Sequence, residues 1–446
     1  MNPNVFANSI QKDISLIEKE KVILVGINQG NDEQYYYEMK ELESLCEASN
    51  YEVIQTITQN LTKPNPATYV GSGKVNEIKE LCEALSIEKI VINDELTPAQ
   101  IKNLSEILGD DIIIIDRTML ILEIFEKRAT SKEGQLQVEL AKLKYMLPRL
   151  VGSRSYLSRT GGGSGGASGA RRGLGETKLE LDKRHLEMKI KRVKDELEEL
   201  KLNRQTARKL RNSADVKTVA LVGYTNAGKS STINALLNLF GEQELPKEVF
   251  VKDMLFATLE AQTRRIKLPN NHQFLLTDTV GFVSKLPHHL VESFKSTLEE
   301  ITEADLIIHI IDASSPFYEQ QMATTLDVIK SLGVSDIPII SVYNKWDLVK
   351  NASLVQLERN SLSISAKLKM GLMELINKID ETLFNEIYYD EFLIPYDRGD
   401  ITNILLEKGE ILELKYLNEG TYVKAGITKE LHQKYLPYQY KNKDCK

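Results

Sequence analysis

The chain has 446 residues and a net charge of −7 at pH 7, with 42% hydrophobic and 27% charged residues. This length predicts about three domains, and the composition is typical of a soluble globular protein. The acidic balance argues against a generally basic nucleic-acid-binding protein, so contact with a nucleic acid would require a local basic segment.

Three scattered cysteines, Cys46, Cys82 and Cys445, fit no metal-ligand spacing. They predict inert thiols in a reduced, cytoplasmic environment. Residues 1–20 contain no long apolar stretch, so we expect no signal peptide. No apolar run approaches the roughly 18 residues that a membrane-spanning helix needs, and we expect no membrane contact.

Residues 21–127 alternate between two kinds of pattern. The runs KVILVGI, YEVIQTI, KIVIN and DIIIID are short and β-rich, whereas EMKELESLCEAS and KVNEIKELCEAL between them are helical in character. Strands that alternate with helices predict a small parallel sheet covered by helices.

Two later stretches predict long helices. From Ser131 to Leu147, and again from Thr177 to about Leu210, apolar residues recur every three or four positions. Pro148 would end the first helix, and Thr177 with Glu180 would form a capping box at the start of the second. The matched spacing predicts an antiparallel pair whose seam contains Leu136, Leu140, Leu143, Leu147, Leu186, Ile190, Val193, Leu197 and Leu200.

A glycine-rich segment, RTGGGSGGASGARRGLGE, lies between these two helices. Residues 142–175 contain no acidic residue but carry Lys142, Lys144, Arg149, Arg154, Arg159, Arg171 and Arg172. Such a composition is typical of a solvated flexible linker. It is equally typical of a loop that follows a phosphate backbone, so both interpretations stay open at this point.

Residues 216–384 alternate again between strand and helix and carry the motifs described next. The tail, residues 388–446, predicts the order strand, helix, strand, strand, helix, which is a small α+β module. These changes of pattern divide the chain into the expected domains 1–130, 131–212, 213–386 and 387–446.

The segment VALVGYTNAGKSS predicts a phosphate-binding loop. It begins as a strand, fits G-x-x-x-x-G-K-S over residues 223–230 and continues into a helical pattern. Glycines at these positions let backbone N–H groups surround the phosphates, and the helix N-terminus points at them. Lys229 would reach the β- and γ-phosphates, and Ser230 would bind Mg²⁺.

Two further motifs predict contacts near the last phosphate. DTVG follows the run HQFLLT, so that Asp278 would hold Mg²⁺ through water and the Gly281 N–H would contact the γ-phosphate. Between the motifs, FATLE supplies Thr258, which can close over Mg²⁺. Phe282 stands where many phosphate-cleaving switches have a glutamine, so we expect another group to orient the attacking water and intrinsic turnover to be slow.

The motif NKWD, residues 344–347, predicts selectivity for guanine. The Asp347 carboxylate can accept hydrogen bonds from the ring N–H and the exocyclic amine of guanine, a pair that adenine does not offer. Asn344 would tie this loop to the P-loop, and Lys345 would lie along the base. The segment SISAK would bring the backbone of residues 365–367 to the guanine carbonyl. The sequence therefore predicts binding of GTP and GDP.

The residues expected to bind the nucleotide come from all these motifs. They are Gly223, Tyr224, Thr225, Asn226, Ala227, Gly228, Lys229, Ser230, Ser231, Phe256, Ala257, Thr258, Leu259, Asp278, Thr279, Val280, Gly281, Asn344, Lys345, Trp346, Asp347, Ser365, Ala366 and Lys367. The expected catalytic residues are Lys229, Thr258 and Gly281, and the expected Mg²⁺ ligands are Ser230, Thr258 and Asp278. Asn226 occupies the P-loop position where potassium-activated GTPases often bind K⁺ through asparagine.

The central motifs together resemble the GTPase domain of the HflX family. The segments DRTMLILEIFEKRA, EGQLQVELAKLKYMLPRL, GLGETKLELDKR and IPYDRGD resemble the flanking domains of that family, so the resemblance spans about residues 20–440. It implies an α/β protein in which a P-loop GTPase domain follows a small parallel α/β domain and a helical hairpin and precedes a small α+β C-terminal domain.

The resemblance also implies a function. It is GTP hydrolysis by a monomer on the large ribosomal subunit, in ribosome splitting, rescue or recycling, with the basic segment 149–175 contacting ribosomal RNA. Two other classes stay open: a ribosome-assembly or RNA-modification GTPase, and a membrane-remodelling GTPase. The last is disfavoured because no basic amphipathic helix with Trp or Phe anchors is found. Some family members are thought to bind ATP in the N-terminal domain, where YVGSGKVNEI is either half a P-loop or a structural turn.

Overall fold

The computed structural model describes most of the chain in two compact units. Unit 1 comprises residues 1–203, 253–259 and 284–294, and unit 2 comprises residues 204–252, 260–283 and 295–446. The described residues are 19–152, 172–212, 216–240, 256, 262–268, 270–287, 290, 295–334, 336–350, 355, 357–358, 361–384 and 387–440.

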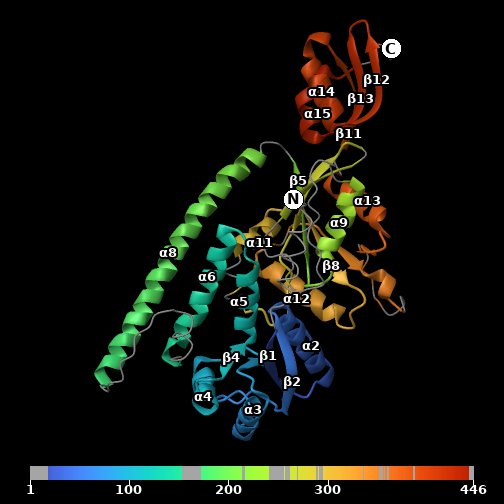
Figure 1. The fold of residues 1–446 in the computed structure, drawn as a ribbon. Coiled ribbons are helices and arrows are strands. Elements are labelled where there is room, and N and C mark those ends of the chain that lie inside the picture. The colour runs from blue at the N-terminus through green and yellow to red at the C-terminus, as the bar shows by residue number, and fades with distance from the viewer. Residues whose placement is uncertain are drawn as a thin grey trace, which may run out of the picture. The chain divides into compact units, whose positions relative to one another are not determined.

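Unit 1 contains the predicted small parallel sheet (Figure 1). Its strands are β1 (Glu20–Asn28), β2 (Tyr51–Asn60), β3 (Lys89–Ile92) and β4 (Ile113–Asp116), in the order β2-β1-β3-β4. All three strand pairs are parallel. Strand β1 is buried along seven consecutive residues because helices cover both faces of the sheet.

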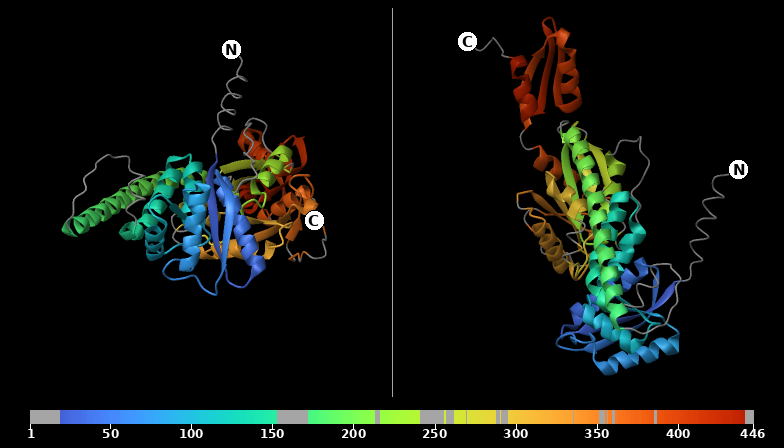
Figure 2. Two further views of the ribbon diagram at one scale, coloured as in Figure 1. Left: turned by 60° about the horizontal axis from the view of Figure 1, so that its bottom comes forward. Right: turned by 90° about the vertical axis from the view of Figure 1, so that its left-hand side faces the viewer.

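Four helices cover this sheet: α2 (Asp32–Ala48), α3 (Ser72–Leu85), α4 (Pro98–Leu108) and α5 (Arg117–Arg128). Helices α3 and α4 pack on one face through a cluster that includes Val75, Ile78 and Leu104. Helices α2 and α5 pack against each other on the opposite side, and Figure 2 shows this layered arrangement in blue and cyan. The segment YVGSGKVNEI covers the end of the loop before α3 and the first two turns of that helix, in which Lys74 pairs with Glu77 at 2.7 Å.

The predicted helical pair is present as α6 (Lys132–Met146) and α8 (Arg172–Asn212), with the 3-10 turn η1 (Leu147–Gly152) after α6. Salt bridges Lys132–Glu196 and Lys189–Glu139 show that the two helices run antiparallel. The seam between them contains Leu136, Leu140, Leu143, Leu186, Ile190, Val193, Leu197 and Leu200. The side chain of Ser131 caps α6 as its N-terminal residue.

Two details of this region differ from the prediction. Helix α8 begins at Arg172 rather than at Thr177, because extending an existing helix by five residues needs no new nucleus and so tolerates Gly173 and Gly175. Arg149 lies over the Tyr145 ring, 3.6 Å from its centroid, and donates to Glu95 at 2.8 Å. Lys142 pairs with Glu126 at 2.8 Å. Arg149 and Lys142 are therefore already neutralised within the protein.

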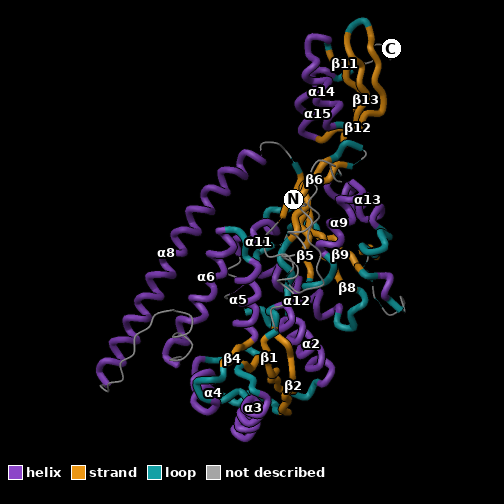
Figure 3. The backbone as a smooth tube through the Cα atoms, in the orientation of Figure 1, coloured by secondary structure: helices purple, strands orange, loops and turns teal. Residues whose placement is uncertain are grey.

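Unit 2 contains a second, larger α/β sheet, whose strands are orange in Figure 3. Its strand order is β10-β9-β8-β5-β7-β6, and only β6 runs antiparallel to its neighbour. The strands are β5 (Lys217–Gly223), β6 (Gln262–Lys267), β7 (Gln273–Asp278), β8 (Leu306–Asp312), β9 (Ile339–Asn344) and β10 (Ser361–Ser363). The accompanying helices are α9 (Lys229–Phe240), α11 (Lys295–Thr302), α12 (Tyr318–Ser331), η2 (Trp346–Leu348) and α13 (Leu372–Leu383).

The C-terminal module has the predicted order of elements. Strand β11 (Ile387–Ile394) is followed by η4 (Tyr396–Arg398), α14 (Gly399–Lys408), β12 (Glu410–Leu417), β13 (Gly420–Thr428), α15 (Lys429–Tyr435) and η5 (Leu436–Tyr438). The antiparallel sheet β11-β13-β12 shares one core with its helices, built from Phe392, Ile401, Val423 and Tyr435 among others.

The described cysteines, Cys46 and Cys82, are both buried and unpaired. Burial raises the pKa of Cys82 to about 11 and raises the pKa of Cys46 still further, so both thiols stay protonated and unreactive at neutral pH. Within the described ranges, no helix is both long enough and apolar enough to cross a membrane.

The α6–α8 seam generates a stability prediction. We expect Leu140→Ala to destabilise the pair by about 2–5 kcal/mol, because it removes buried methyl groups and leaves a cavity. Native-state hydrogen exchange of the α8 amides should then speed up by a factor of roughly 30 or more. Met188→Ala on the same helix is the control, since that side chain is 55% exposed. If the α8 amides exchanged equally fast in Leu140→Ala and Met188→Ala, the packing of Leu140 in the α6–α8 seam would be contradicted.

Candidate functional site

The predicted motifs meet at one edge of the unit 2 sheet. The P-loop follows β5, DTVGF follows β7, and NKWD and SISAK follow β9 and β10. These strands are parallel, so their carboxyl ends lie on the same edge, which is where open α/β sheets bind ligands.

Two glycines of the P-loop occupy positions that no other residue fits. Gly223 has φ +152°, and a Cβ there would lie 2.2 Å from the backbone oxygen of Ile310. Gly228 has φ +95°, and a Cβ there would lie 2.2 Å from Nδ2 of Asn344. The spacing of the motif therefore follows from close backbone approach at both ends of the loop.

Lys229 lies at the first residue of α9 and is only 6% exposed. Its Nζ donates to the carbonyl oxygens of Gly223 at 3.0 Å and Tyr224 at 2.9 Å. Burial lowers the pKa of Lys229 to about 8, although the nearby Asp278 carboxylate acts in the opposite direction. A buried cation held in this way is suited to receiving an anion such as a phosphate.

Ser230 and Asp278 bring two oxygen ligands together. The Ser230 hydroxyl donates to Oδ2 of Asp278 at 2.8 Å, and Asp278 is fully buried at the end of β7. The hydroxyl in the first turn of α9 and the carboxylate at the end of β7 are oxygen donors of the kind that Mg²⁺ prefers. The two residues therefore fit the predicted metal site.

The DTVGF segment lies directly against the P-loop. The Phe282 N–H donates to Gly223 O at 3.2 Å, and the Thr225 N–H donates to Phe282 O at 2.7 Å. A Cβ on Gly281 would lie 2.8 Å from Cγ2 of Thr225 and 3.0 Å from Nζ of Lys229. The Phe282 side chain is 2% exposed, so it packs inside the protein and offers no group to a water molecule.

Asn344 joins the P-loop to the two loops after β9 and β10. Its Nδ2 donates to Ala227 O at 2.9 Å, and its Oδ1 accepts from the Ala366 N–H at 3.0 Å. The side chain is 2% exposed, so both ends of the amide are satisfied within the protein. This is the connection that the sequence predicted for Asn344.

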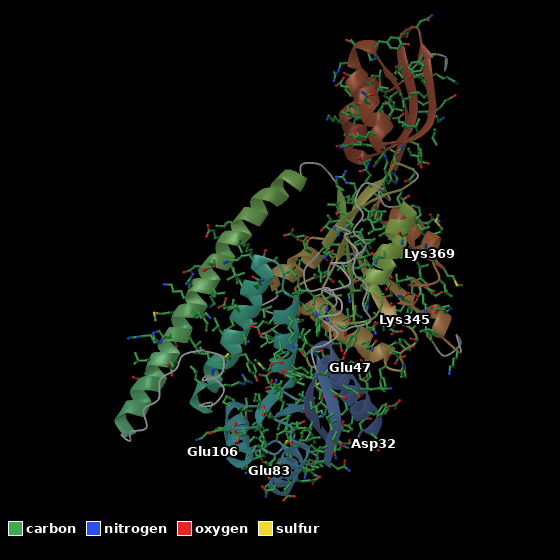
Figure 4. All side chains as sticks on the ribbon, viewed as in Figure 1. Asp32, Glu47, Glu83, Glu106, Lys345 and Lys369 are labelled. Carbon is green, nitrogen blue, oxygen red and sulfur yellow. The ribbon has the colours of Figure 1, made fainter. Side chains whose placement is uncertain are left out.

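Asp347 lies on the exposed side of the same loops. Its Oδ1 accepts a hydrogen bond from the Ser365 hydroxyl at 2.6 Å, which fixes the carboxylate without neutralising it. Lys345, labelled in Figure 4, has φ +59° and pairs with Asp312 at 2.8 Å. The site thus combines a buried cation for phosphate with an oriented carboxylate that can recognise a base.

The other predicted residues are distributed around this frame. Thr279 donates to Leu221 O at 2.5 Å, Asn226 is exposed with φ +59°, and Lys367 is exposed. Ala257, Thr258 and Leu259 lie outside the described residues. Phe256 is described and belongs to unit 1, where it is 2% exposed and packs edge-to-face on Phe125 with ring centroids 4.6 Å apart.

Two polar residues of β8 lie beside the predicted site residues but were not among those predicted from the sequence. Asp312 orients Lys345, and His309 is 1% exposed with its pKa lowered to about 4 by burial and by Lys229. His309 is therefore neutral at physiological pH and adds no charge beside Lys229. Its position as a single polar residue within the apolar run LIIHII was the signal that could have identified it.

Three family models match most of the chain. Residues 36–126 match the family model "GTP-binding GTPase N-terminal", residues 128–211 match "GTP-binding GTPase Middle Region", and residues 218–345 match "50S ribosome-binding GTPase". A solved structure of a GTP-binding protein from Sulfolobus solfataricus in complex with GDP is similar, at 24% identity and a TM-score of 0.43 over 82% of this chain and 99% of that one.

Curated relatives match nearly the full length. The GTPase HflX of Caldanaerobacter subterraneus subsp. tengcongensis is 45% identical, over 94% of this chain and 93% of the relative. The GTPase HflX of Escherichia coli K12 is 36% identical, over 92% of this chain and 93% of the relative. The chain belongs to the HflX family of GTPases.

Proposed function

We propose that this GTPase is a molecular switch that binds GTP at the unit 2 site and acts on the large ribosomal subunit in the cytoplasm. The observation that carries the nucleotide part is the Asn344 side chain, which bonds to Ala227 of the P-loop and to Ala366 of the base loop. These two hydrogen bonds support a site in which the phosphate-binding and base-recognising loops share one frame.

In this proposal each residue has a distinct task in hydrolysis. Lys229 stabilises charge on the β- and γ-phosphates, and the Gly281 N–H contacts the γ-phosphate. Ser230, Asp278 and Thr258 would hold Mg²⁺, and the ion would supply further positive charge. Because Phe282 is buried, the water must be oriented by another group, and contact with the ribosome would complete the site.

The ribosomal part of the proposal is supported by the family and by the basic segment 149–175. Arg149 of this segment is paired with Glu95, so the RNA contacts are assigned to Arg154, Arg159, Arg171 and Arg172. The first three lie outside the described residues, and Arg172 is the first residue of α8. Binding of this kind would serve ribosome splitting, rescue or recycling by a monomeric protein.

One experiment separates this role from ribosome assembly or RNA modification. Sedimentation with mature large subunits and with precursor particles is compared in GDP, GTP and a non-hydrolysable analogue. A splitting or rescue factor should bind mature subunits best with GTP or the analogue. Preference for precursors would favour the assembly role.

Guanine selectivity should depend on Asp347. We expect Asp347→Asn to weaken GTP binding by about 2–4 kcal/mol, roughly 30- to 1000-fold, and to gain affinity for xanthosine triphosphate. The Ser365 hydroxyl can keep donating to the amide oxygen, which leaves the amide N–H₂ facing the base. Nucleotide titration tests this, with Asp327→Asn in α12 as an exposed control. If Asp347→Asn bound GTP as tightly as the unmodified protein, Asp347 would not be the residue that recognises guanine.

Potassium should accelerate hydrolysis. We propose that Asn226 would hold K⁺, and the cation would supply positive charge for the negative charge that develops on the phosphates in the transition state. Turnover should be faster in potassium than in sodium buffer. Asn226→Gly should lose most of that difference, because glycine accepts φ +59° but lacks the side-chain oxygen. If the unmodified protein hydrolysed GTP equally fast in potassium and sodium buffers, K⁺ binding by Asn226 would be excluded.

Ribosome binding should depend on salt through the basic segment. With about four phosphate contacts, a fourfold rise in salt should weaken binding by roughly fiftyfold. Replacing Arg171 and Arg172 by Ala should reduce the slope of log affinity against log salt by about 1.5 units. GTP affinity should stay constant, and Arg264→Ala with Arg265→Ala in β6 is the matched control. A wild-type slope in the Arg171/Arg172 variant would contradict RNA contact.

A further inference from the structure

The P-loop and the DTVGF segment meet at Thr225. Tyr224 and Phe282 form an isolated parallel β-bridge, in which the Phe282 N–H donates to Gly223 O at 3.2 Å and the Thr225 N–H donates to Phe282 O at 2.7 Å. The backbone that carries the Thr225 side chain is therefore fixed directly beside the segment that follows β7.

The hydroxyl of Thr225 is buried without a partner. The residue is 6% exposed, and within the described part of the chain its Oγ1 has no hydrogen-bond partner. A buried hydroxyl in this state lowers stability, because it has lost its hydrogen bonds to water and gained none in exchange. Native structures contain few such groups, and a role in catalysis is one explanation for those that they keep.

The surroundings of this side chain are those in which the proposed function places the γ-phosphate. A Cβ built on Gly281 would lie 2.8 Å from Cγ2 of Thr225 and 3.0 Å from Nζ of Lys229. The Thr225 side chain, the Gly281 backbone and the Lys229 amine are therefore neighbours. In the proposed function the last two contact the γ-phosphate, so Thr225 stands beside the group that water attacks.

Other polar groups near the expected phosphates are engaged or lie elsewhere. Thr279 donates to a backbone carbonyl of β5 at 2.5 Å, and Ser230 donates to the carboxylate at the end of β7 at 2.8 Å. His309 is buried, and its Nδ1 has no partner among the described residues, but strand β5 lies between its own strand β8 and β7. Thr225, by contrast, combines an uncommitted oxygen with a place beside Gly281.

We propose that the Thr225 hydroxyl orients the water that attacks the γ-phosphate, the task that the buried Phe282 side chain leaves open. The inference rests on the proposed function and adds a catalytic residue to it. A threonine hydroxyl has one donor and two acceptor positions. It accepts a hydrogen bond from the water, whose lone pair then faces phosphorus, and donates its own hydrogen to a γ-phosphate oxygen.

The reaction balances without a protein base. The water oxygen forms a bond to the γ-phosphorus, and the bond from that phosphorus to the β–γ bridging oxygen breaks. The electron pair of the broken bond stays on the β-phosphate of GDP, where Lys229 stabilises the charge. One proton of the water passes to an oxygen of the released phosphate. Thr225 keeps its own proton, so its contribution is the orientation of the water.

Thr225→Val separates catalysis from packing, because valine keeps the shape of threonine and lacks the hydroxyl. Single-turnover GTP hydrolysis by the full-length protein should slow by at least about tenfold. Affinity for GDP and for a non-hydrolysable GTP analogue should change by less than about threefold, because the hydroxyl acts on the transition state. The melting temperature of the nucleotide-free protein should stay the same or rise, because an unpaired buried hydroxyl is removed.

Two further variants are compared with it. Thr225→Ser keeps the hydroxyl and should hydrolyse GTP within about threefold of the unmodified rate. Thr325→Val in α12 is the matched control, since Thr325 is fully buried in the same unit but its hydroxyl donates to Gln321 O at 3.0 Å. Hydrolysis should be unchanged in this control.

Several outcomes would overturn the proposal. Hydrolysis by Thr225→Val at the unmodified rate, or equal slowing in Thr325→Val, would show that the Thr225 hydroxyl has no special role. Equal slowing in Thr225→Ser would make the γ-methyl group responsible. A lower melting temperature in Thr225→Val would show that the hydroxyl is bonded within the protein, and a loss of analogue affinity as large as the loss of rate would make it a ground-state ligand. If the unmodified protein neither bound nor hydrolysed GTP, the proposed function would fail instead.

Discussion

The proposed nucleotide site depends on one buried side-chain amide. Asn344 donates to the P-loop and accepts from the loop after β10, so two loops that are far apart in sequence share a single fixed group. Gly228 must lack a side chain for this amide to approach, which links the glycine of one motif to the asparagine of another. A substitution at Asn344 would leave a buried N–H or carbonyl unpaired and release both loops together.

Much of the arrangement of the site residues was predictable because those residues belong to short contiguous sequence motifs. The positions of Gly223, Lys229, Asp278 and Asn344 each follow from a motif at the end of a strand, and parallel strands bring those ends together. The seam of the α6–α8 pair was predictable for a similar reason, since its leucines recur at helical spacing. The α8 start was not, because extension past a capping box costs little once a helix exists.

Charge pairs between distant segments were beyond sequence reasoning. Arg149 was counted among the basic residues available to RNA, but Glu95 neutralises it across more than fifty positions of sequence. Ser284 and Lys285 carried no motif at all, and their partners on α2 and after β3 are even farther away in the chain. Local sequence periodicity does not predict contacts between charged residues that are far apart in the chain. Apolar patterns predict which face is buried, whereas the pairing of individual charges depends on the completed fold.

The lowered pKa of Lys229 links nucleotide binding to protons. In the free protein, burial brings this pKa to about 8, so part of the population is uncharged at slightly alkaline pH. A polyanionic phosphate beside the amine favours the charged form and raises that pKa again. Because burial lowers the pKa of Lys229 and a bound phosphate would raise it again, nucleotide binding at this lysine would be coupled to proton uptake.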